Sequence, residues 1–139
     1  MCEEAPDIPG SGDVVAWFGH WPTFHDAEVV SITLKRRGES SVSIHAFNVT
    51  SEIEPTGCFK TASDATVLFF LDGLLNDGYE INNHLEGFNN QNVLSGLTVK
   101  KNPGGYELVL EGIFGVDGTI YSKQLRVALE PGVPPDSKM

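Results

Sequence analysis

The sequence has few basic residues and almost no cysteine. It contains 9 Lys and Arg residues against 19 Asp and Glu residues, which gives a formal net charge of −10 at pH 7. Such a charge repels the phosphates of nucleic acids and anionic lipids and attracts basic partners. Cys2 and Cys58 are the only cysteines, so we expect free thiols and no disulfide framework of the kind that stabilises small secreted domains.

Long hydrophobic runs are also missing. The longest near-continuous run extends from Val67 to Leu71, whereas a helix needs about 20 apolar residues to span a bilayer. The first seven residues are acidic and lack the basic and hydrophobic regions of a secretory signal. These features predict a cytoplasmic protein without membrane contact.

The sequence lacks the motifs of the common enzyme classes. It has no GxSxG, no GxGxxG before a helix, no Walker lysine, and no HExxH, CxxC or EF-hand spacing. We therefore expect no cofactor and no catalytic residue, and a binding protein is favoured over an enzyme.

The composition of the chain fits one domain with flanking tails. Its 139 residues are 40% hydrophobic, which is enough for a core at this size. Residues 1–10 and 131–139 are rich in Pro and Gly and are predicted to be loose tails, with one domain at 11–130 between them. Ser11 is expected to cap a short helix that runs through Phe18 and is stopped by Pro22.

Most of the remaining sequence alternates with the period of β-strands. Val30, Ile32 and Leu34 are expected on one face of a first strand. In the second strand Val42, Ile44 and Ala46 should point inward and Ser43 and His45 outward, with a bulge near Ala46. The predicted strands are 28–35, 41–49, 65–71, 93–100, 106–114 and 119–129, and residues 79–85 are a candidate for another.

Tight turns connect the last three strands. Asn102 to Gly105 joins one pair, and Asp117-Gly118 joins the next, which is a strong hairpin signal. The sequence therefore predicts a mainly β fold, or an α+β fold if the helix is counted. The architecture would be an antiparallel six- to seven-stranded sandwich or open barrel with one short N-terminal helix.

The densest polar cluster lies between the helix and the first strand. His20, His25 and Asp26, with Glu28 nearby, could bind a metal or act in acid–base chemistry. Neighbouring side chains on a strand point to opposite faces, so the favoured interpretation is that these groups satisfy backbone atoms where the chain enters the sheet.

Three other features bear on function: an amide-rich stretch, a tryptophan and two histidines. The amide-rich stretch from Glu86 to Asn92 contains Asn89 and Asn90, which are available either to bridge loop backbone or to contact a partner. The four aromatic residues Trp17, Phe18, Trp21 and Phe24 are expected to pack the helix onto the sheet, and Trp21 would be a binding anchor if it were exposed. His45 and His84 look isolated in the sequence.

Three stretches of the sequence resemble the bacterial immunity protein 50 family. They are Trp21-Pro22-Thr23-Phe24-His25-Asp26-Ala27-Glu28-Val29, the stretch from Leu85 to Val93 around Gly87-Phe88-Asn89, and Phe114-Gly115-Val116-Asp117-Gly118-Thr119. The resemblance covers roughly residues 13–130. It implies a cytoplasmic antidote that binds and neutralises a toxin protein, and it assigns no catalytic residue.

The resemblance and the acidic charge together predict direct binding to a cognate toxin, for which a basic nuclease is one candidate. A small ligand-binding or oligomerising module and a metal-dependent enzyme that uses His20, His25 and Asp26 remain alternatives. The residues expected to contact the partner are Trp21, Asp26, Glu28, Asp72, Asp77, Glu80, Asn89 and Asn90.

Overall fold

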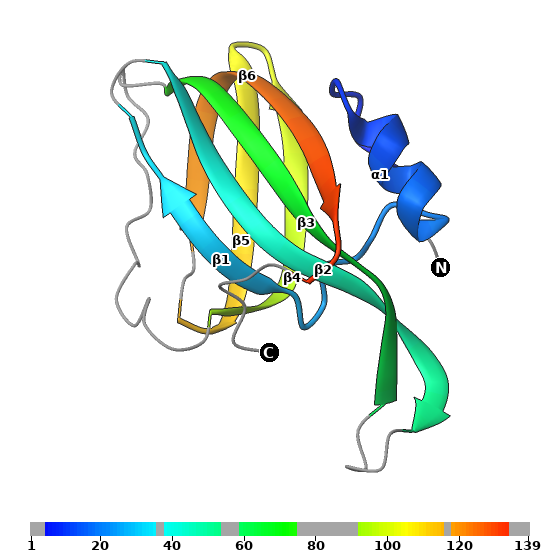
Figure 1. The fold of residues 1–139 in the computed structure, drawn as a ribbon. Coiled ribbons are helices and arrows are strands. Elements are labelled where there is room, and N and C mark those ends of the chain that lie inside the picture. Colours follow the sequence, from blue (N-terminus) through cyan, green and yellow to red (C-terminus); the bar gives the residue numbers. More distant parts are fainter. Residues whose placement is uncertain (1–4, 36–37, 54–58, 75–91, 116–117, 134–139) are drawn as a thin grey trace.

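Six antiparallel strands form a closed barrel in the spatial order β1-β2-β3-β6-β5-β4 (Figure 1). This computed structural model describes residues 5–35, 38–53, 59–74, 92–115 and 118–133. The elements are α1 (Ser11–Phe18), β1 (Glu28–Thr33), β2 (Glu39–Ile53), β3 (Phe59–Leu74), β4 (Val93–Asn102), β5 (Gly105–Phe114) and β6 (Gly118–Pro131). The prediction of a mainly β fold with one N-terminal helix is confirmed. Of the two predicted architectures, a sandwich and an open barrel, the structure has the barrel, and this barrel is closed.

No helix in the part of the chain that the structure describes is long and apolar enough to cross a membrane. The predicted strand at 79–85 and His84 lie outside the described residues.

Strand β2 follows the predicted alternation. Val42, Ile44 and Ala46 are buried in the core, and the pairing of β2 with β3 shifts between Ala46 and Asn48, where the bulge was expected. Beyond this bulge the β2–β3 hairpin extends away from the barrel (Figure 1). The bulge therefore separates the part of β2 that forms the barrel wall from the part that leaves it.

The inward face of β1 differs from the prediction. Val29 is buried in the core, whereas Leu34 is exposed, and the pairing of β1 with β2 shifts between Val29 and Ser31. A bulge at this point exchanges the two faces of a strand. Ile32 consequently packs against the core although Val30 does not belong to it.

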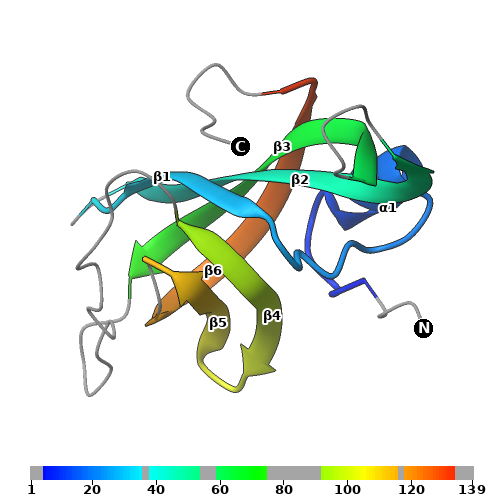
Figure 2. The ribbon, with the colours of Figure 1, turned by 90° about the horizontal axis from the view of Figure 1, so that it is seen from below.

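Residues 8–18 cover the part of β6 that β5 does not pair with. Strand β5 pairs with β6 only through residues 118–122, so the rest of β6 has β3 on one side and needs cover on the other. The Val127 N–H donates to Pro9 O at 2.9 Å, and α1 packs against β6 and β3 (Figure 2). Residues 8–10 are thus part of the fold, which corrects the prediction of a loose tail there.

The ends of α1 also differ from the prediction. Gly10, with φ 92°, occupies the position before the helix, and no side chain caps the helix there, so Ser11 is the first helical residue. At the other end Gly19, with φ 84°, donates its N–H to Val15 O at 2.7 Å. A left-handed glycine is a common helix terminator, and it ends α1 before Pro22 is reached.

The barrel closes between β1 and β4 over a short seam. Glu28 pairs with Val93, and three backbone hydrogen bonds extend the contact: Val29 N–H to Asn92 O, Leu94 N–H to Ala27 O and Asp26 N–H to Leu94 O. Residues 26 and 27 therefore continue the edge of β1 along β4. The stretch that the sequence marked as a polar cluster is the segment that closes the barrel.

The C-terminal boundary of the barrel lies slightly beyond the predicted one. Strand β6 continues to Pro131, and the Gly132 N–H donates to Asp64 O at 2.8 Å. Residues 131 and 132 are therefore held by β3, although they were predicted to belong to a loose tail.

Candidate functional site

An aromatic cluster anchors the segment between α1 and β1. The Trp21 ring lies 5.8 Å from the Phe24 ring and 6.3 Å from the Phe69 ring, in edge-to-face geometry. Trp21 is only 4% exposed. Trp21 therefore packs the segment against the core, as favoured from the sequence, and its alternative placement at a partner interface is corrected because that required exposure.

The turn that follows Trp21 has an unusual backbone. Phe24 has φ 61° and Asp26 has φ 64°, and no other non-glycine residue that the structure describes has a positive φ. This conformation is unfavourable for a bulky side chain such as Phe. It allows the Phe24 ring to enter the core while the flanking His25 and Asp26 side chains remain exposed.

His25 and Asp26 form an exposed pair on this turn. The side chains are 63% and 54% exposed, and His25 Nε2 lies 3.7 Å from Asp26 Oδ2. His25 Nδ1 lies 3.2 Å from Ser95 O, and a carbonyl oxygen can only accept, so Nδ1 must carry the proton of this hydrogen bond. In the neutral ring, Nε2 is then a hydrogen-bond acceptor beside a carboxylate.

His20 is held by neighbouring oxygen atoms. Its Nδ1 lies 3.0 Å from Trp21 O and its Nε2 lies 3.1 Å from Asn48 Oδ1. Asn48 Nδ2 donates to Phe18 O at 3.1 Å, which fixes the orientation of the amide. His20 and Asn48 therefore link the end of α1 to the bulge of β2, a structural role for His20.

These residues surround a surface cavity of about 370 Å³, called here the His25 cavity. It is lined by His20, Pro22, Thr23, Phe24, His25, Asp26, Ala27, Ala46, Phe47 and Asn48. The structure thus brings the predicted trio of His20, His25 and Asp26 to one place. In the described part of the chain, however, no group of three or more His, Cys, Asp or Glu side chains could hold a metal ion.

A second polar group lies across the outer face of β1, β2 and β3. Glu28 is opposite His45 in the β1–β2 pairing, and His45 Nε2 lies 2.9 Å from Asp64 Oδ1. Glu28 is 2% exposed and His45 is 4% exposed. The prediction that His45 is isolated is wrong, and Glu28 is too deeply buried to contact a partner, which corrects its assignment to the interface.

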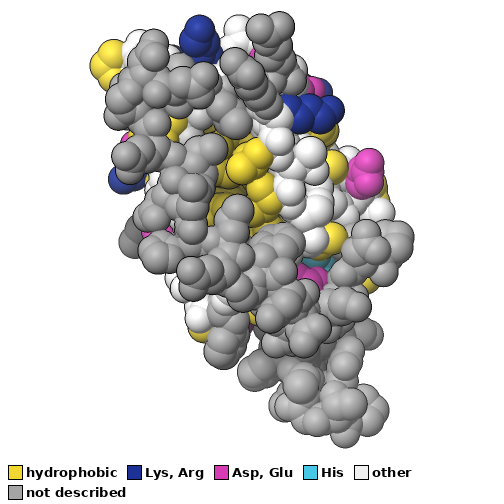
Figure 3. Space-filling view, turned by 90° about the vertical axis from the view of Figure 1, so that its left-hand side faces the viewer, with side chains coloured by type: hydrophobic (Ala, Val, Ile, Leu, Met, Phe, Trp, Pro, Cys, Tyr) yellow, Lys and Arg dark blue, Asp and Glu magenta, His cyan; other side chains and the backbone are white. Residues whose placement is uncertain are grey.

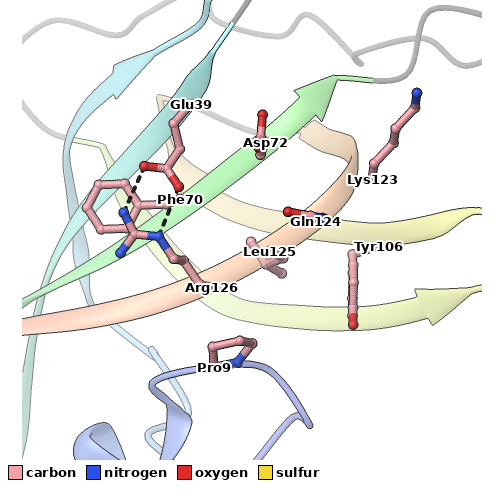
Figure 4. Close-up of a pocket in the computed structure, with 9 residues that line it drawn as sticks. All are labelled: Pro9, Glu39, Phe70, Asp72, Tyr106, Lys123, Gln124, Leu125 and Arg126. Atoms are coloured by element: carbon pink, nitrogen blue, oxygen red, sulfur yellow. Dashed lines mark hydrogen bonds and ion pairs between the residues drawn. The ribbon is translucent and has the colours of Figure 1, made fainter.

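A second surface cavity, called here the Arg126 cavity, has a volume of about 410 Å³. Its lining comprises Pro9, Glu39, Phe70, Asp72, Tyr106, Lys123, Gln124, Leu125 and Arg126 (Figure 4). The Arg126 guanidinium lies 4.0 Å from the centre of the Phe70 ring and donates two hydrogen bonds to Glu39, at 2.9 and 2.7 Å.

The hydrogen bond from Arg126 lowers the pKa of Glu39 below its usual range. The same bond raises the pKa of Arg126. The strongest charges of this cavity therefore satisfy each other, so the cavity offers a ligand little free charge beyond the exposed Asp72 and Lys123.

Several of the described carboxylates gather toward one end of the barrel strands. Glu28, His45, Thr66 and Glu130 form one row across β1, β2, β3 and β6. Around this row lies a group of carboxylates, called here the acidic region, that comprises Asp26, Glu28, Asp64, Glu111 and Glu130.

The lysines whose side chains the structure describes lie toward the opposite ends of these strands. The Lys35 N–H donates to Ser40 Oγ at the beginning of β2, and Lys101 is level with Tyr106 and Ser122, next to Lys123. On the face seen in Figure 3, the Lys and Arg side chains lie in the upper part of the view with acidic side chains among them, and a His side chain lies beside an acidic one lower down. The protein thus has an acidic region at one end of these strands and a region of mixed charge at the other, where Lys123 and Arg126 lie close to Glu39 and Asp72, an arrangement that the net charge alone does not reveal.

The remaining residues that were predicted to contact a partner lie either at one of the two cavities or outside the described residues. Asp26 lies at the His25 cavity and Asp72 at the Arg126 cavity, and both are exposed. Asp77, Glu80, Asn89 and Asn90 lie outside the described residues. Asn48, Asp64 and Ser95 hold the histidines in place, and no local sequence signal marked them.

Comparison with protein-family models, with curated proteins and with solved structures gives no match to this chain.

Proposed function

We propose that this protein is a non-catalytic binding protein that neutralises a toxin by direct contact in the cytoplasm. The observation that carries the proposal is the exposed His25–Asp26 pair on a turn with two left-handed non-glycine residues. Unfavourable backbone conformations often occur at functional sites, because the surrounding structure must hold them in place. Here the aromatic cluster and the barrel seam hold the turn.

The distribution of charge supports a basic partner. Asp26, Glu111 and Glu130 are exposed carboxylates of the acidic region, and the lysines whose side chains the structure describes lie toward the opposite ends of the strands. Complementary charge accelerates association and favours the correct partner. A basic toxin, such as a nuclease whose active site binds phosphates, is the class of partner that this arrangement fits.

The resemblance of residues 21–29 to the immunity protein 50 family supports the same function. In the barrel this stretch closes the seam and presents His25 and Asp26 to solvent. The same stretch thus closes the barrel and carries an exposed polar pair. This suits a family whose members share one fold and bind different partners.

A ligand-binding module is the second candidate. The Arg126 cavity, at about 410 Å³, is within the range of small-molecule sites. Its Arg126–Glu39 pair is already satisfied internally, so we rank this candidate second.

The proposal is tested by capture followed by a toxicity assay. The tagged protein is used to capture partners from a lysate of its own host at about 0.05 M and about 0.5 M salt, because surface charge pairs are screened at the higher concentration. Each captured protein is then expressed with and without this chain.

We expect a basic protein that is retained at low salt, lost at high salt, and lethal unless this chain is co-expressed. If no captured protein is toxic on its own, or if co-expression fails to restore growth, the neutralising function is rejected.

A further inference from the structure

The His25 cavity contains two hydrogen-bond acceptors, and no Lys or Arg is among the described residues that line it. His25 Nδ1 donates to Ser95 O, which leaves Nε2 of the neutral ring as an acceptor. Asp26 Oδ2 lies 3.7 Å from this nitrogen. None of the residues that line the cavity is Lys or Arg, so His25 is the one basic side chain of the lining that is paired with Asp26, and while its ring is neutral the Asp26 charge is not neutralised there.

The rest of the cavity lining is largely apolar. Pro22, Ala46 and Phe47 contribute to it, and Phe47 is half-buried with its ring 5.4 Å from that of His45. The cavity volume of about 370 Å³ exceeds that of any single side chain. An aliphatic chain with a planar cationic end would find apolar contacts along its stem and acceptors at its tip.

The Arg126 cavity shows how this barrel binds a guanidinium. Figure 4 shows the Arg126 side chain between the Phe70 ring and the Glu39 carboxylate, which holds it through two hydrogen bonds. Stacking on an aromatic face and pairing with a carboxylate are the two interactions that favour Arg over Lys. The His25 cavity contains the same two kinds of group, Phe47 and Asp26, together with the His25 acceptor.

We propose that the His25 cavity binds an arginine side chain of the toxin, with the guanidinium donating to Asp26 and to His25 Nε2 and lying against Phe47. This inference rests on the proposed function and specifies the contact group of its partner. An arginine that a nuclease uses to bind phosphate is a suitable occupant, because covering it would also block the substrate.

The inference is tested with small probes that need no toxin. The purified full-length protein is titrated with Nα-acetyl-arginine amide, and binding is followed through backbone amide signals in NMR spectra. The neutral isostere Nα-acetyl-citrulline amide and the corresponding lysine derivative are titrated in parallel.

We expect saturable shifts for the amides of residues 23–27, 47–48 and 95 with the arginine probe, at a Kd on the order of millimolar. Citrulline should bind about tenfold more weakly or worse, because it lacks the charge, and lysine should fall between the two probes. Equal binding of citrulline, or arginine-induced shifts that spare these residues, would overturn the site.

A matched pair of variants assigns the effect to Asp26. Asn tolerates the left-handed backbone almost as well as Asp, so Asp26→Asn removes the charge and keeps the turn. Asp72→Asn removes the same charge from the Arg126 cavity. We expect about a tenfold loss of arginine-probe affinity in Asp26→Asn and no change in Asp72→Asn, and the reverse result, or equal losses, would refute the assignment.

The outcomes separate this inference from the proposed function. If the probe fails while a toxin is still captured and neutralised, the arginine site is overturned and the function stands. If the probe binds as expected but no toxic partner exists, the cavity remains a guanidinium site and its assignment to a toxin is overturned.

Discussion

Two serine side chains are completely buried in this barrel, and they differ in their hydrogen bonds. Ser40 Oγ accepts from the Lys35 N–H at 2.8 Å and donates to Lys35 O at 3.4 Å. Ser122 Oγ has no partner among the described residues. A buried polar group without a partner costs free energy, whereas a satisfied one contributes modestly to stability.

This difference predicts opposite effects of the same substitution. Ser122→Ala should raise the free energy of unfolding by about 0.5–1 kcal/mol, since it removes a desolvated hydroxyl. Ser40→Ala should lower it by about 1–2 kcal/mol, because the Lys35 backbone loses its partner. Urea denaturation of both variants measures the effect, and similar losses in the two would show that Ser122 has a bonding partner after all.

At the scale of the element, α1 acts as the cover of the β6 edge. The contact of α1 with β6 depends on Gly10, which has a φ of 92° and lies against the backbone of Val127. A Cβ at Gly10 would come within 1.7 Å of Val127 O, whereas a Cβ at Gly12 would meet nothing within 4 Å. The two glycines are therefore a matched pair for testing the contact.

Gly10→Ala should lower the free energy of unfolding by about 2 kcal/mol or more, because the methyl group requires the helix to move away and the backbone is strained. Gly12→Ala should raise it by about 0.5–1 kcal/mol, because Ala favours the helix and nothing opposes it. Thermal or urea unfolding gives both values. If Gly10→Ala proved as stable as Gly12→Ala, residues 8–18 would not be seated on β6 as described.

At the scale of the whole molecule, the barrel is unevenly joined. Strand β3 pairs with β2 along most of its length and with β6 from Ala65 to Leu74. By contrast, β1 pairs with β4 at one position, extended by the backbone bonds of residues 26–29. Local opening is expected where the fewest interactions must break. The seam that presents His25 and Asp26 should therefore open before the rest of the barrel.

Native-state hydrogen exchange tests this prediction. We expect the amides of Val29 and Leu94, which donate across the seam, to exchange at least about a hundredfold faster than those of residues 65–71 in β3. The amides of residues 108–110, in the β5–β6 pairing, serve as a control within the same half of the barrel. Uniform protection across all three groups would show that the barrel opens only as a whole.

Much of the fold was predictable from local patterns. The alternation in residues 41–49 and the hairpin between Asn102 and Gly105 depend on side-chain period and turn chemistry, which are properties of neighbouring residues. The structure confirms them, with Asn102 paired to Gly105 and the β2 bulge next to Ala46. The bulge in β1 was not predicted, because Val29 and Val30 are equally suited to the core and only pairing with β2 chooses between them.

The candidate site was predictable only in part. The cluster of His20, His25 and Asp26 stood out because polar side chains are dense there, and the structure places all three around one cavity. Their roles depend on residues distant in the sequence: Asn48 for His20 and Ser95 for His25. The pairing of His45 with Asp64 likewise spans two strands, and no local pattern contains this information.

The amino-acid sequence alone determined the mainly β fold class, the N-terminal helix and the excess of negative charge, because these follow from local propensity and composition. Closure of the barrel, the burial of Glu28 and the gathering of carboxylates toward one end of the strands were decided by tertiary structure. Each of these depends on which strands become neighbours, and that choice is made by the packing of the whole chain around one core.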